Sequence, residues 1–199
     1  MYWTNWTGKF LLILALFLPT AVLPAPEPLT PRVDRSQGGD FTLISPMGPV
    51  SLQEYRGQVV LMFFGFTSCP DICPIALSVI SRVLKQLEPT EREQVRGLFV
   101  SLDPERDTVP VLKKYTGYFH PNIVGATNRI EVIRQVADKY GIKFEKKIQE
   151  SSPIGYIIRH PPDILVVNQQ GELLESRIKP GHGAEDITVL VRQLLGTDS

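Results

Sequence analysis

Residues 58–87 read QVVLMFFGFTSCPDICPIALSVISRVLKQL and contain the pattern that decides the fold. The first part, residues 58–66, is a near-continuous apolar run with β-branched and aromatic members, which is typical of a buried central strand. The last part repeats apolar residues at helical spacing up to Pro89, and Pro74 stands where a first helical turn tolerates proline. The segment therefore predicts a strand, a loop that carries Cys69 and Cys73, and a helix.

The rest of the chain continues this alternation of strands and helices. Asn128 is the expected N-cap of one helix, and Gly141 is its expected end. This order predicts an α/β domain in which a central mixed sheet is flanked by helices, with a hairpin at its N-terminal end. The hairpin is expected at residues 41–44 and 48–52; further strands at 97–102, 122–126, 154–159, 163–168 and 172–178, with a turn at 169–171; and further helices at 108–119, 129–140 and 184–195.

The N-terminus has the features of an export signal. Lys9 precedes a short apolar run, so residues 1–23 predict a signal peptide or a membrane anchor. The run is shorter than the ~20 residues of a comfortable membrane span, and the prolines after it provide no clear cleavage site, so both possibilities stay open. Residues 24–39, rich in proline and glycine, predict a linker, and residues 40–199 predict one domain.

Composition narrows the class of protein. The chain has 199 residues, of which 43% are hydrophobic, and its 21 basic residues balance 21 acidic ones. No dense Lys/Arg stripe is interleaved with aromatic residues, so we expect no nucleic-acid binding. The two cysteines are too few for a disulfide scaffold, a four-cysteine zinc site or a cysteine-ligated iron–sulfur cluster within one chain.

The cysteine pair allows two kinds of chemistry. Residues four apart share one face of a helix, so Cys69 and Cys73 are close enough for a disulfide. In the reduced state, the positive end of the following helix favours thiolates, and two soft thiolates suit Cu(I). One added imidazole gives a three-ligand site that also holds Cu(II). A plain structural disulfide is the alternative, although so short a loop gains little stability from it.

Two motifs resemble a known family. Residues 65–74, GFTSCPDICP, and residues 100–108, VSLDPERDT, closely resemble the SCO/SenC family of cytochrome c oxidase assembly factors, and the likeness covers about residues 40–195. The resemblance implies a thioredoxin-like fold of the peroxiredoxin-like variant and one copper ion per chain. It also implies a partner, the copper-site subunit of cytochrome c oxidase, to which copper is delivered or whose cysteines are reduced. The upstream copper donor is not identified.

The family's ligands can be carried over by position. Cys69 and Cys73 match the two thiolate ligands, and His160 matches the histidine ligand. The family commonly has an acidic residue before this histidine and small polar residues after it. Here Arg159 precedes it and Pro161-Pro162 follows it, so the local charge and the stiffness of the loop differ from the family pattern.

Other residues are weaker candidates. Between the two remaining histidines, His182 lies in a glycine-flanked loop and is the better substitute ligand, whereas His120 reads as a helix-terminal residue. Asp103 and Asp107 follow a strand and are suited to orienting the metal loop, to docking a partner or to capping a turn. Asp71 is suited to tuning the thiolates or to capping the helix.

The leading interpretation is a copper chaperone rather than an enzyme with turnover, in the bacterial cell envelope on the periplasmic side of the inner membrane. The absence of an Arg-rich, Ser-rich presequence favours that compartment over a mitochondrion. The alternative is a thiol:disulfide oxidoreductase that keeps the target cysteines reduced, although such proteins usually have two residues between their cysteines. A peroxidase is a third interpretation, suggested by Thr67-Ser68-Cys69, but the upstream proline of that pattern is missing.

Overall fold

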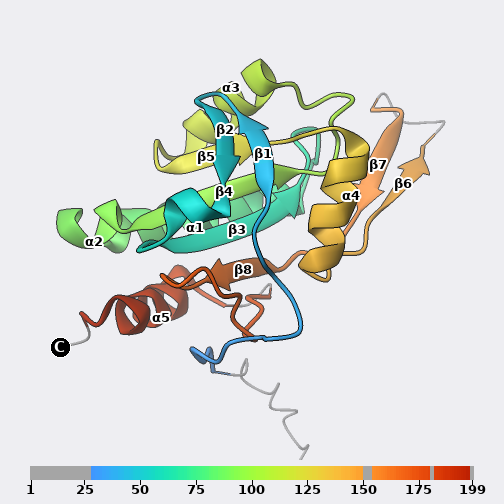
Figure 1. Ribbon diagram of the computed structural model, residues 1–199. Coiled ribbons are helices and arrows are strands. Elements are labelled where there is room, and N and C mark those ends of the chain that lie inside the picture. Colours follow the sequence, from blue (N-terminus) through green and yellow to red (C-terminus); the bar gives the residue numbers. More distant parts are fainter. Residues whose placement is uncertain (1–27, 150–153, 180–181, 198–199) are drawn as a thin grey trace, which may run out of the picture.

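The computed structural model describes residues 28–149, 154–179 and 182–197. The predicted signal or anchor at residues 1–23 and the start of the predicted linker lie outside these ranges. Within them, no helix combines the length and the apolar character that a membrane span requires. The order of strands and helices matches an α/β domain (Figure 1).

A four-stranded sheet forms the centre of the domain. Its strand order is β5-β4-β3-β8, with β3 and β4 in the middle. The pairs β3–β4 and β4–β5 are parallel and β3–β8 is antiparallel, so the predicted mixed sheet is confirmed. Every residue of β3 is buried, as its apolar run predicts. The strands are β3 (Val59–Gly65), β4 (Val95–Ser101), β5 (Ile123–Ala126) and β8 (Ile164–Val167).

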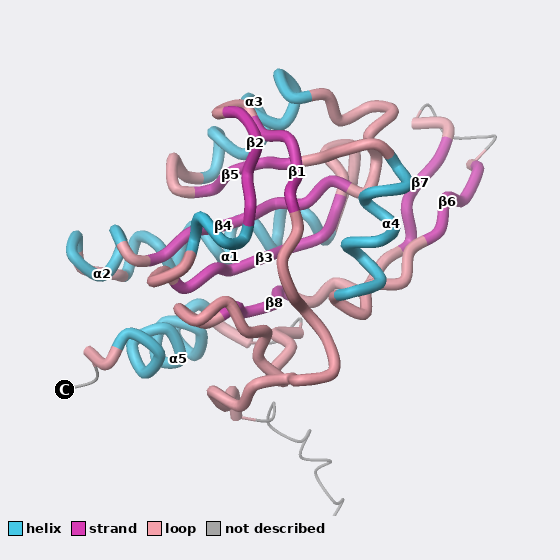
Figure 2. The backbone as a smooth tube through the Cα atoms, viewed as in Figure 1, coloured by secondary structure: helices cyan, strands magenta, loops and turns pink. Residues whose placement is uncertain are grey.

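Helices cover both faces of this sheet (Figure 2). A Cβ at Gly97 of β4 would lie 3.1 Å from the Ile80 side chain, which places α1 on that face. α5 packs on α1, and α3 packs on the edge strand β5. On the other face, Phe64 of β3 contacts Tyr140 at the end of α4. These helices are α1 (Ile72–Gln86), α3 (Val109–Phe119), α4 (Ile130–Lys139) and α5 (Ala184–Leu195).

The hairpin and two short helical turns complete the N-terminal half. The predicted hairpin is confirmed as β1 (Thr42–Ser45) and β2 (Gly48–Ser51), and the 3-10 helix η1 (Leu52–Tyr55) follows it. The helix α2 (Pro89–Glu93) was not predicted, because Pro89 was interpreted only as the end of α1; it stands instead at the first position of a new helix. Asn128 is not the N-cap of α4: Arg129 holds that position, and its N–H donates to Asn128 Oδ1.

The C-terminal half departs further from expectation. β6 (Glu145–Ile148) and β7 (Tyr156–Arg159) form a separate antiparallel pair. β6 was not predicted because its residues are exposed and mostly charged, so they show no apolar pattern. The strand predicted at residues 172–178 is reduced to isolated bridges, Val167 with Leu173 and Ile164 with Ile178, along β8.

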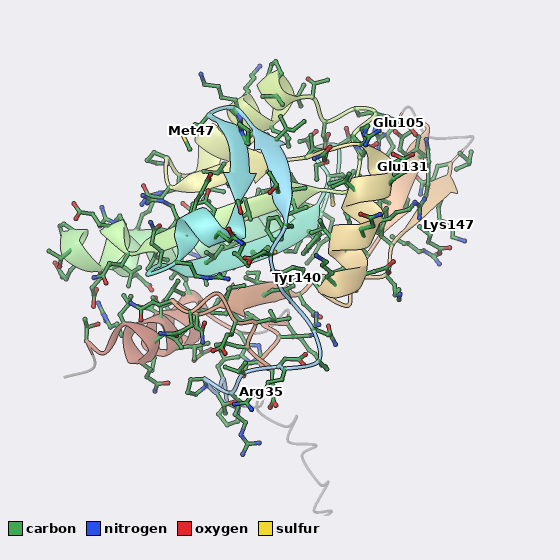
Figure 3. All side chains as sticks on the ribbon, in the orientation of Figure 1. Arg35, Met47, Glu105, Glu131, Tyr140 and Lys147 are labelled. Carbon is green, nitrogen blue, oxygen red and sulfur yellow. The ribbon has the colours of Figure 1, made fainter. Side chains whose placement is uncertain are left out.

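Tyr140 ties the predicted linker to the core. Its ring is fully buried against Phe41 and Phe64, at centroid distances of 5.8 and 6.0 Å. Its hydroxyl donates a 2.8 Å hydrogen bond to the carbonyl of Gly39; Figure 3 labels Tyr140 among the side chains of the domain. Gly141, with φ +66°, ends α4 directly after it, as predicted. The chain therefore enters the domain at a fixed position beside α4.

We predict that Tyr140→Phe lowers the free energy of unfolding by about 1 kcal/mol, because it removes the partly buried hydrogen bond to the Gly39 carbonyl while the ring packing stays. Urea titration followed by circular dichroism measures the change. Tyr118→Phe is the control, since Tyr118 is 87% exposed and loses no buried hydrogen bond. Equal stability of both variants would contradict the role of the Tyr140 hydroxyl.

Candidate metal centre

The two cysteines lie on either side of the start of α1. Asp71 holds the N-cap position without a side-chain hydrogen bond to the helix, and α1 begins at Ile72. Cys73 therefore belongs to the first helical turn, whereas Cys69 lies in the preceding loop. The sequence predicted a loop that carries both cysteines, but the helix begins at Ile72 and includes Cys73; the two sulfurs still meet at the helix entry, where they share a hydrogen bond. The open N–H groups of the first turn still favour negative charge at this end.

Gly65 makes room for the Cys73 sulfur. It is the last residue of β3, and a Cβ there would lie 2.8 Å from Cys73 Sγ and 2.9 Å from the rings of Phe63 and Phe99. Atoms at that distance would clash, so only glycine lets the sulfur pack directly on the strand end. Cys73 is fully buried as a result, whereas Cys69 is half-buried.

His160 approaches Cys73 from the other side. It directly follows β7, and its Nε2 lies 3.7 Å from Cys73 Sγ. Its ring packs edge-on against Phe63 and Phe66, at centroid distances of 5.8 and 6.1 Å. The structure thus brings together two residues that are 87 positions apart in the sequence.

Pro161 fixes the orientation of the histidine. His160 Nδ1 lies 2.8 Å from the Pro161 carbonyl oxygen. A carbonyl only accepts hydrogen bonds, so Nδ1 carries the proton and the lone pair of Nε2 faces Cys73. Burial lowers the pKa of His160, and the imidazole is therefore neutral at neutral pH, as a metal ligand must be.

The two thiols have opposite acidities. Both cysteines are free, and the hydrogen bond from Cys73 lowers the pKa of Cys69 to about 5, with help from backbone hydrogen bonds of Asp71 and Cys73. The same hydrogen bond, together with burial, raises the pKa of Cys73. At neutral pH the pair therefore consists of an accessible Cys69 thiolate and a buried Cys73 thiol.

The geometry fits a metal bound between Cys73 and His160. With the bond lengths of zinc, about 2.3 Å to sulfur and about 2.0 Å to nitrogen, an angle of about 110–120° separates the two ligand atoms by about 3.5–3.7 Å. The observed separation is 3.7 Å. In the described residues, however, no three His, Cys, Asp or Glu side chains form a ready metal cluster. A three-ligand site at this place therefore requires Cys69 to move toward the other two.

Asp107 holds the cysteine loop. It is fully buried and accepts hydrogen bonds from the backbone N–H and the hydroxyl of Thr67, at 2.9 and 2.5 Å, and from the Ser101 hydroxyl at 2.6 Å. Burial raises the pKa of Asp107, while these three donors favour its ionised form. Thr67 begins the loop that leads to Cys69, so the interpretation of Asp107 as an orienting residue matches its contacts.

Arg106 holds the strand that leads to His160, and sequence reasoning missed it. Its guanidinium stacks on the Tyr156 ring at 3.6 Å and donates to the carbonyls of Ile154 and Tyr156, at 3.0 and 3.1 Å. Asp103 pairs with Arg106 and accepts a 2.8 Å hydrogen bond from the Tyr156 hydroxyl. Arg106 lies in the motif at residues 100–108, but nothing in the motif indicates which strand it contacts.

The other candidates lie elsewhere. His120 stands at the C-cap of α3, where its Nδ1 accepts a hydrogen bond from the Asn122 N–H at 3.0 Å. This is the helix-terminal role that its sequence context predicts. His182 precedes α5, and its Nδ1 lies 3.3 Å from the Lys179 carbonyl. Arg159 is exposed and lies 3.9 Å from the Glu145 carboxylate, so its charge points to solvent.

Fold and site together define a class of protein. A mixed sheet with a two-cysteine loop at the carboxyl end of its central strand, and a histidine facing the buried thiol, is typical of thioredoxin-like proteins with thiol redox or metal-binding chemistry. The chain belongs to the SCO1/SenC family, whose model matches residues 30–196.

Similar proteins agree with this assignment. The chain is 38% identical over 157 residues to the mitochondrial protein SCO2 homolog of Bos taurus. The matched residues make up 78% of this chain and 58% of that protein. The copper-bound structure of ScoI from Bradyrhizobium japonicum superposes with a TM-score of 0.72 at 29% identity, covering 80% of this chain and 99% of that one. BsSco, a member of the Sco family of cytochrome c oxidase assembly proteins in which a disulfide switch was identified, superposes with a TM-score of 0.62 at 26% identity, covering 82% and 95%.

We predict that alkylation of Cys69 by iodoacetamide follows a titration with a midpoint near pH 5, because the thiolate is the reactive form and its pKa is about 5. Reactivity rises with pH through this midpoint and levels off above it, so it is high at neutral pH. Cys73→Ala removes the donor and moves the midpoint of Cys69 toward that of a free thiol, about 8.5. Mass spectrometry of the modified peptide measures both. A midpoint near 8.5 in the parent would contradict the asymmetry of the pair.

Proposed function

We propose that this protein binds one copper ion through Cys69, Cys73 and His160 and passes it on during cytochrome c oxidase assembly. The observation that carries the proposal is the 3.7 Å approach of His160 Nε2 to Cys73 Sγ, with the nitrogen lone pair aimed at the sulfur. A simple redox pair has no need of a neutral imidazole oriented in this way. A metal shared by sulfur and nitrogen does.

The donor set supports copper rather than zinc. Thiolates and an imidazole suit both Cu(I) and Cu(II), whereas structural zinc is almost always bound by four ligands. Copper is also bound in the related ScoI of Bradyrhizobium japonicum. Cys69 is only half-buried. We therefore expect Cys69 to bind the metal after Cys73 and His160 have bound it.

The partner that we propose is the copper-site subunit of cytochrome c oxidase, which receives copper by ligand exchange. Support comes from the family, since BsSco is described among the cytochrome c oxidase assembly proteins. The proposed location is the periplasmic side of a bacterial inner membrane, where the apolar segment at residues 10–18 anchors or exports the domain. The upstream donor is left open.

We predict that the reduced protein binds one Cu(I) and that His160→Ala raises its dissociation constant more than about 100-fold, since even the loss of a residue that only hydrogen-bonds to a metal ligand weakens binding about 10–100-fold. Titration against a chromophoric Cu(I) chelator measures both values. His182→Ala is the matched control and should bind like the parent. If His160→Ala binds as tightly as the parent, the proposed site is wrong.

A second function is favoured by the asymmetry of the thiols. The Cys69 thiolate attacks one sulfur of a target disulfide and releases the other as a thiolate. Cys73, after losing its proton, then attacks the Cys69 sulfur and releases the reduced target. Two electrons pass to the target, and a Cys69–Cys73 disulfide remains that an external thiol reductant must reduce. The disulfide switch identified in BsSco supports this alternative.

We predict that this reaction is slow with general substrates such as insulin, because His160 and Phe66 crowd the buried Cys73. A turbidity assay with dithiothreitol as reductant measures it, with Cys69→Ser as the control. Rapid insulin reduction by the parent, combined with failure to hold Cu(I) against the chelator, would favour the oxidoreductase over the chaperone.

A further inference from the structure

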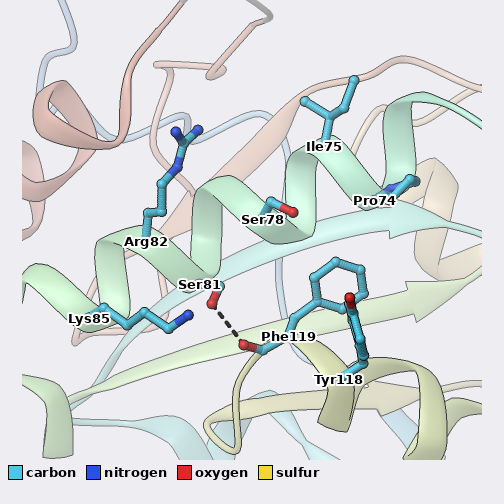
Figure 4. A pocket seen from close by; sticks show the side chains of 8 residues that line it. All are labelled: Pro74, Ile75, Ser78, Ser81, Arg82, Lys85, Tyr118 and Phe119. Carbon is cyan, nitrogen blue, oxygen red and sulfur yellow. Dashed lines mark hydrogen bonds between the residues drawn. The ribbon is translucent and has the colours of Figure 1, made fainter.

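A groove runs between α1 and the C-terminal end of α3 (Figure 4). Its volume is about 660 Å³ and it is open to solvent. Its first lining residue, Pro74, belongs to the same helical turn as Cys73, so a partner bound in the groove contacts the helix that carries the buried thiol. The groove is lined by Pro74, Ile75, Ser78, Ser81, Arg82 and Lys85 of α1 and by Tyr118 and Phe119 of α3.

Large apolar side chains stand exposed along this groove. Tyr118 is 87% exposed and Ile75 is 53% exposed. The Tyr118 ring packs edge-on against Phe119, with centroids 5.4 Å apart. The carbonyl of Phe119 in turn accepts a 2.8 Å hydrogen bond from Ser81 of α1 (Figure 4). An exposed tyrosine on a fixed base is typical of the residues that dominate protein–protein interfaces.

The charge of the groove is positive. Arg82 and Lys85 are its only charged lining residues. In the part of the chain that the structure describes, neither forms an ion pair within 4.0 Å. The charge of Arg82 contributes to lowering the pKa of Glu185 of α5. Among the described residues, Glu185 forms no ion pair with Lys85. The groove therefore complements carboxylates that approach from outside.

The position of the groove favours a protein over a membrane surface. The sheet order is β5-β4-β3-β8, and α3 packs at the β5 edge. The first described residues lie at the opposite edge, where Val33 pairs with Leu174 and Leu174 with Val166 of β8 (Figure 1). A chain tethered through its N-terminus therefore presents α3 away from the tether.

We propose that this groove docks the protein with which the chain exchanges its metal, through a surface of that partner that carries carboxylates around an apolar residue. The proposal rests on the proposed function. Tyr118 and Ile75 contact the apolar residue, and Arg82 and Lys85 pair with the carboxylates. Docking there holds the partner against the helix that begins at the candidate metal centre and leaves the half-buried Cys69 accessible.

The test uses the full chain in detergent micelles and a defined probe, the purified, metal-free exported domain of the copper-site subunit of cytochrome c oxidase from the same organism. Calorimetry gives the dissociation constant at ~50 and ~300 mM salt. We expect Arg82→Glu/Lys85→Glu to weaken binding at least about 10-fold at low salt and to remove most of its salt dependence. We expect Tyr118→Ala to weaken binding about 10-fold at either salt concentration.

Matched controls keep the test specific. Lys113→Glu/Lys114→Glu also reverses two positive charges, at exposed positions of α3 outside the groove lining, and Val189→Ala truncates an exposed residue of α5; both should bind like the parent. If the groove variants bind like these controls, or if the parent does not bind the domain, the docking proposal is overturned. It is also overturned if the parent binds vesicles of phosphatidylglycerol through Arg82 and Lys85 and does not bind the domain.

The docking test is independent of the proposed copper site, because both partners are metal-free. Cu(I) titration of the same groove variants completes it and should give parent-like dissociation constants. If the parent binds the exported domain of the copper-site subunit but does not bind Cu(I), the proposed function is wrong and the docking proposal is still supported.

Discussion

The contact between the end of β3 and the sulfur of Cys73 is the constraint on which the rest of the site depends. Gly65 has no side chain, so the sulfur packs directly against the strand, and the first turn of α1 is fixed in position and direction. A buried sulfur on an apolar strand has no water to stabilise its charge. The buried Cys73 thiol therefore keeps its proton and donates it in a hydrogen bond that lowers the pKa of Cys69, while the burial of His160 itself lowers the pKa of its imidazole and keeps it neutral.

One loop supports both halves of the candidate centre. Asp103, Arg106 and Asp107 lie in the segment between β4 and α3. Asp107 binds the start of the cysteine loop through Thr67, while Arg106 binds the strand before His160 through Tyr156. One segment of the chain therefore contacts both the loop that carries Cys69 and the strand that leads to His160. A change in this loop alters the two sides of the centre together.

The sequence was sufficient for the parts of the fold that rest on periodic burial. β3 and α1 follow from an apolar run and a helical repeat, and their ends were predicted to within a few residues. β6 was not predictable from the sequence, because its residues are exposed and mostly charged and pair only with β7. Residues 172–178 form isolated bridges instead of a strand, because only part of that segment runs along β8.

Cys69 and Cys73 were evident from spacing, although the start of the helix between them was not. His160 was found only through family resemblance, since no local pattern distinguishes it from a loop histidine, and the contacts of Arg106 depend on tertiary packing.

The different depths of the two cysteines give any exchange at this centre an order of events. Cys73 lies beneath the helix end and against the strand, whereas Cys69 lies in the loop that solvent reaches. An incoming ligand or thiol therefore meets Cys69 first, and Cys73 reacts only through it. The fold thus gives the two sulfurs different access, so that any exchange at this pair proceeds in two steps, first at the exposed Cys69 and then at the buried Cys73.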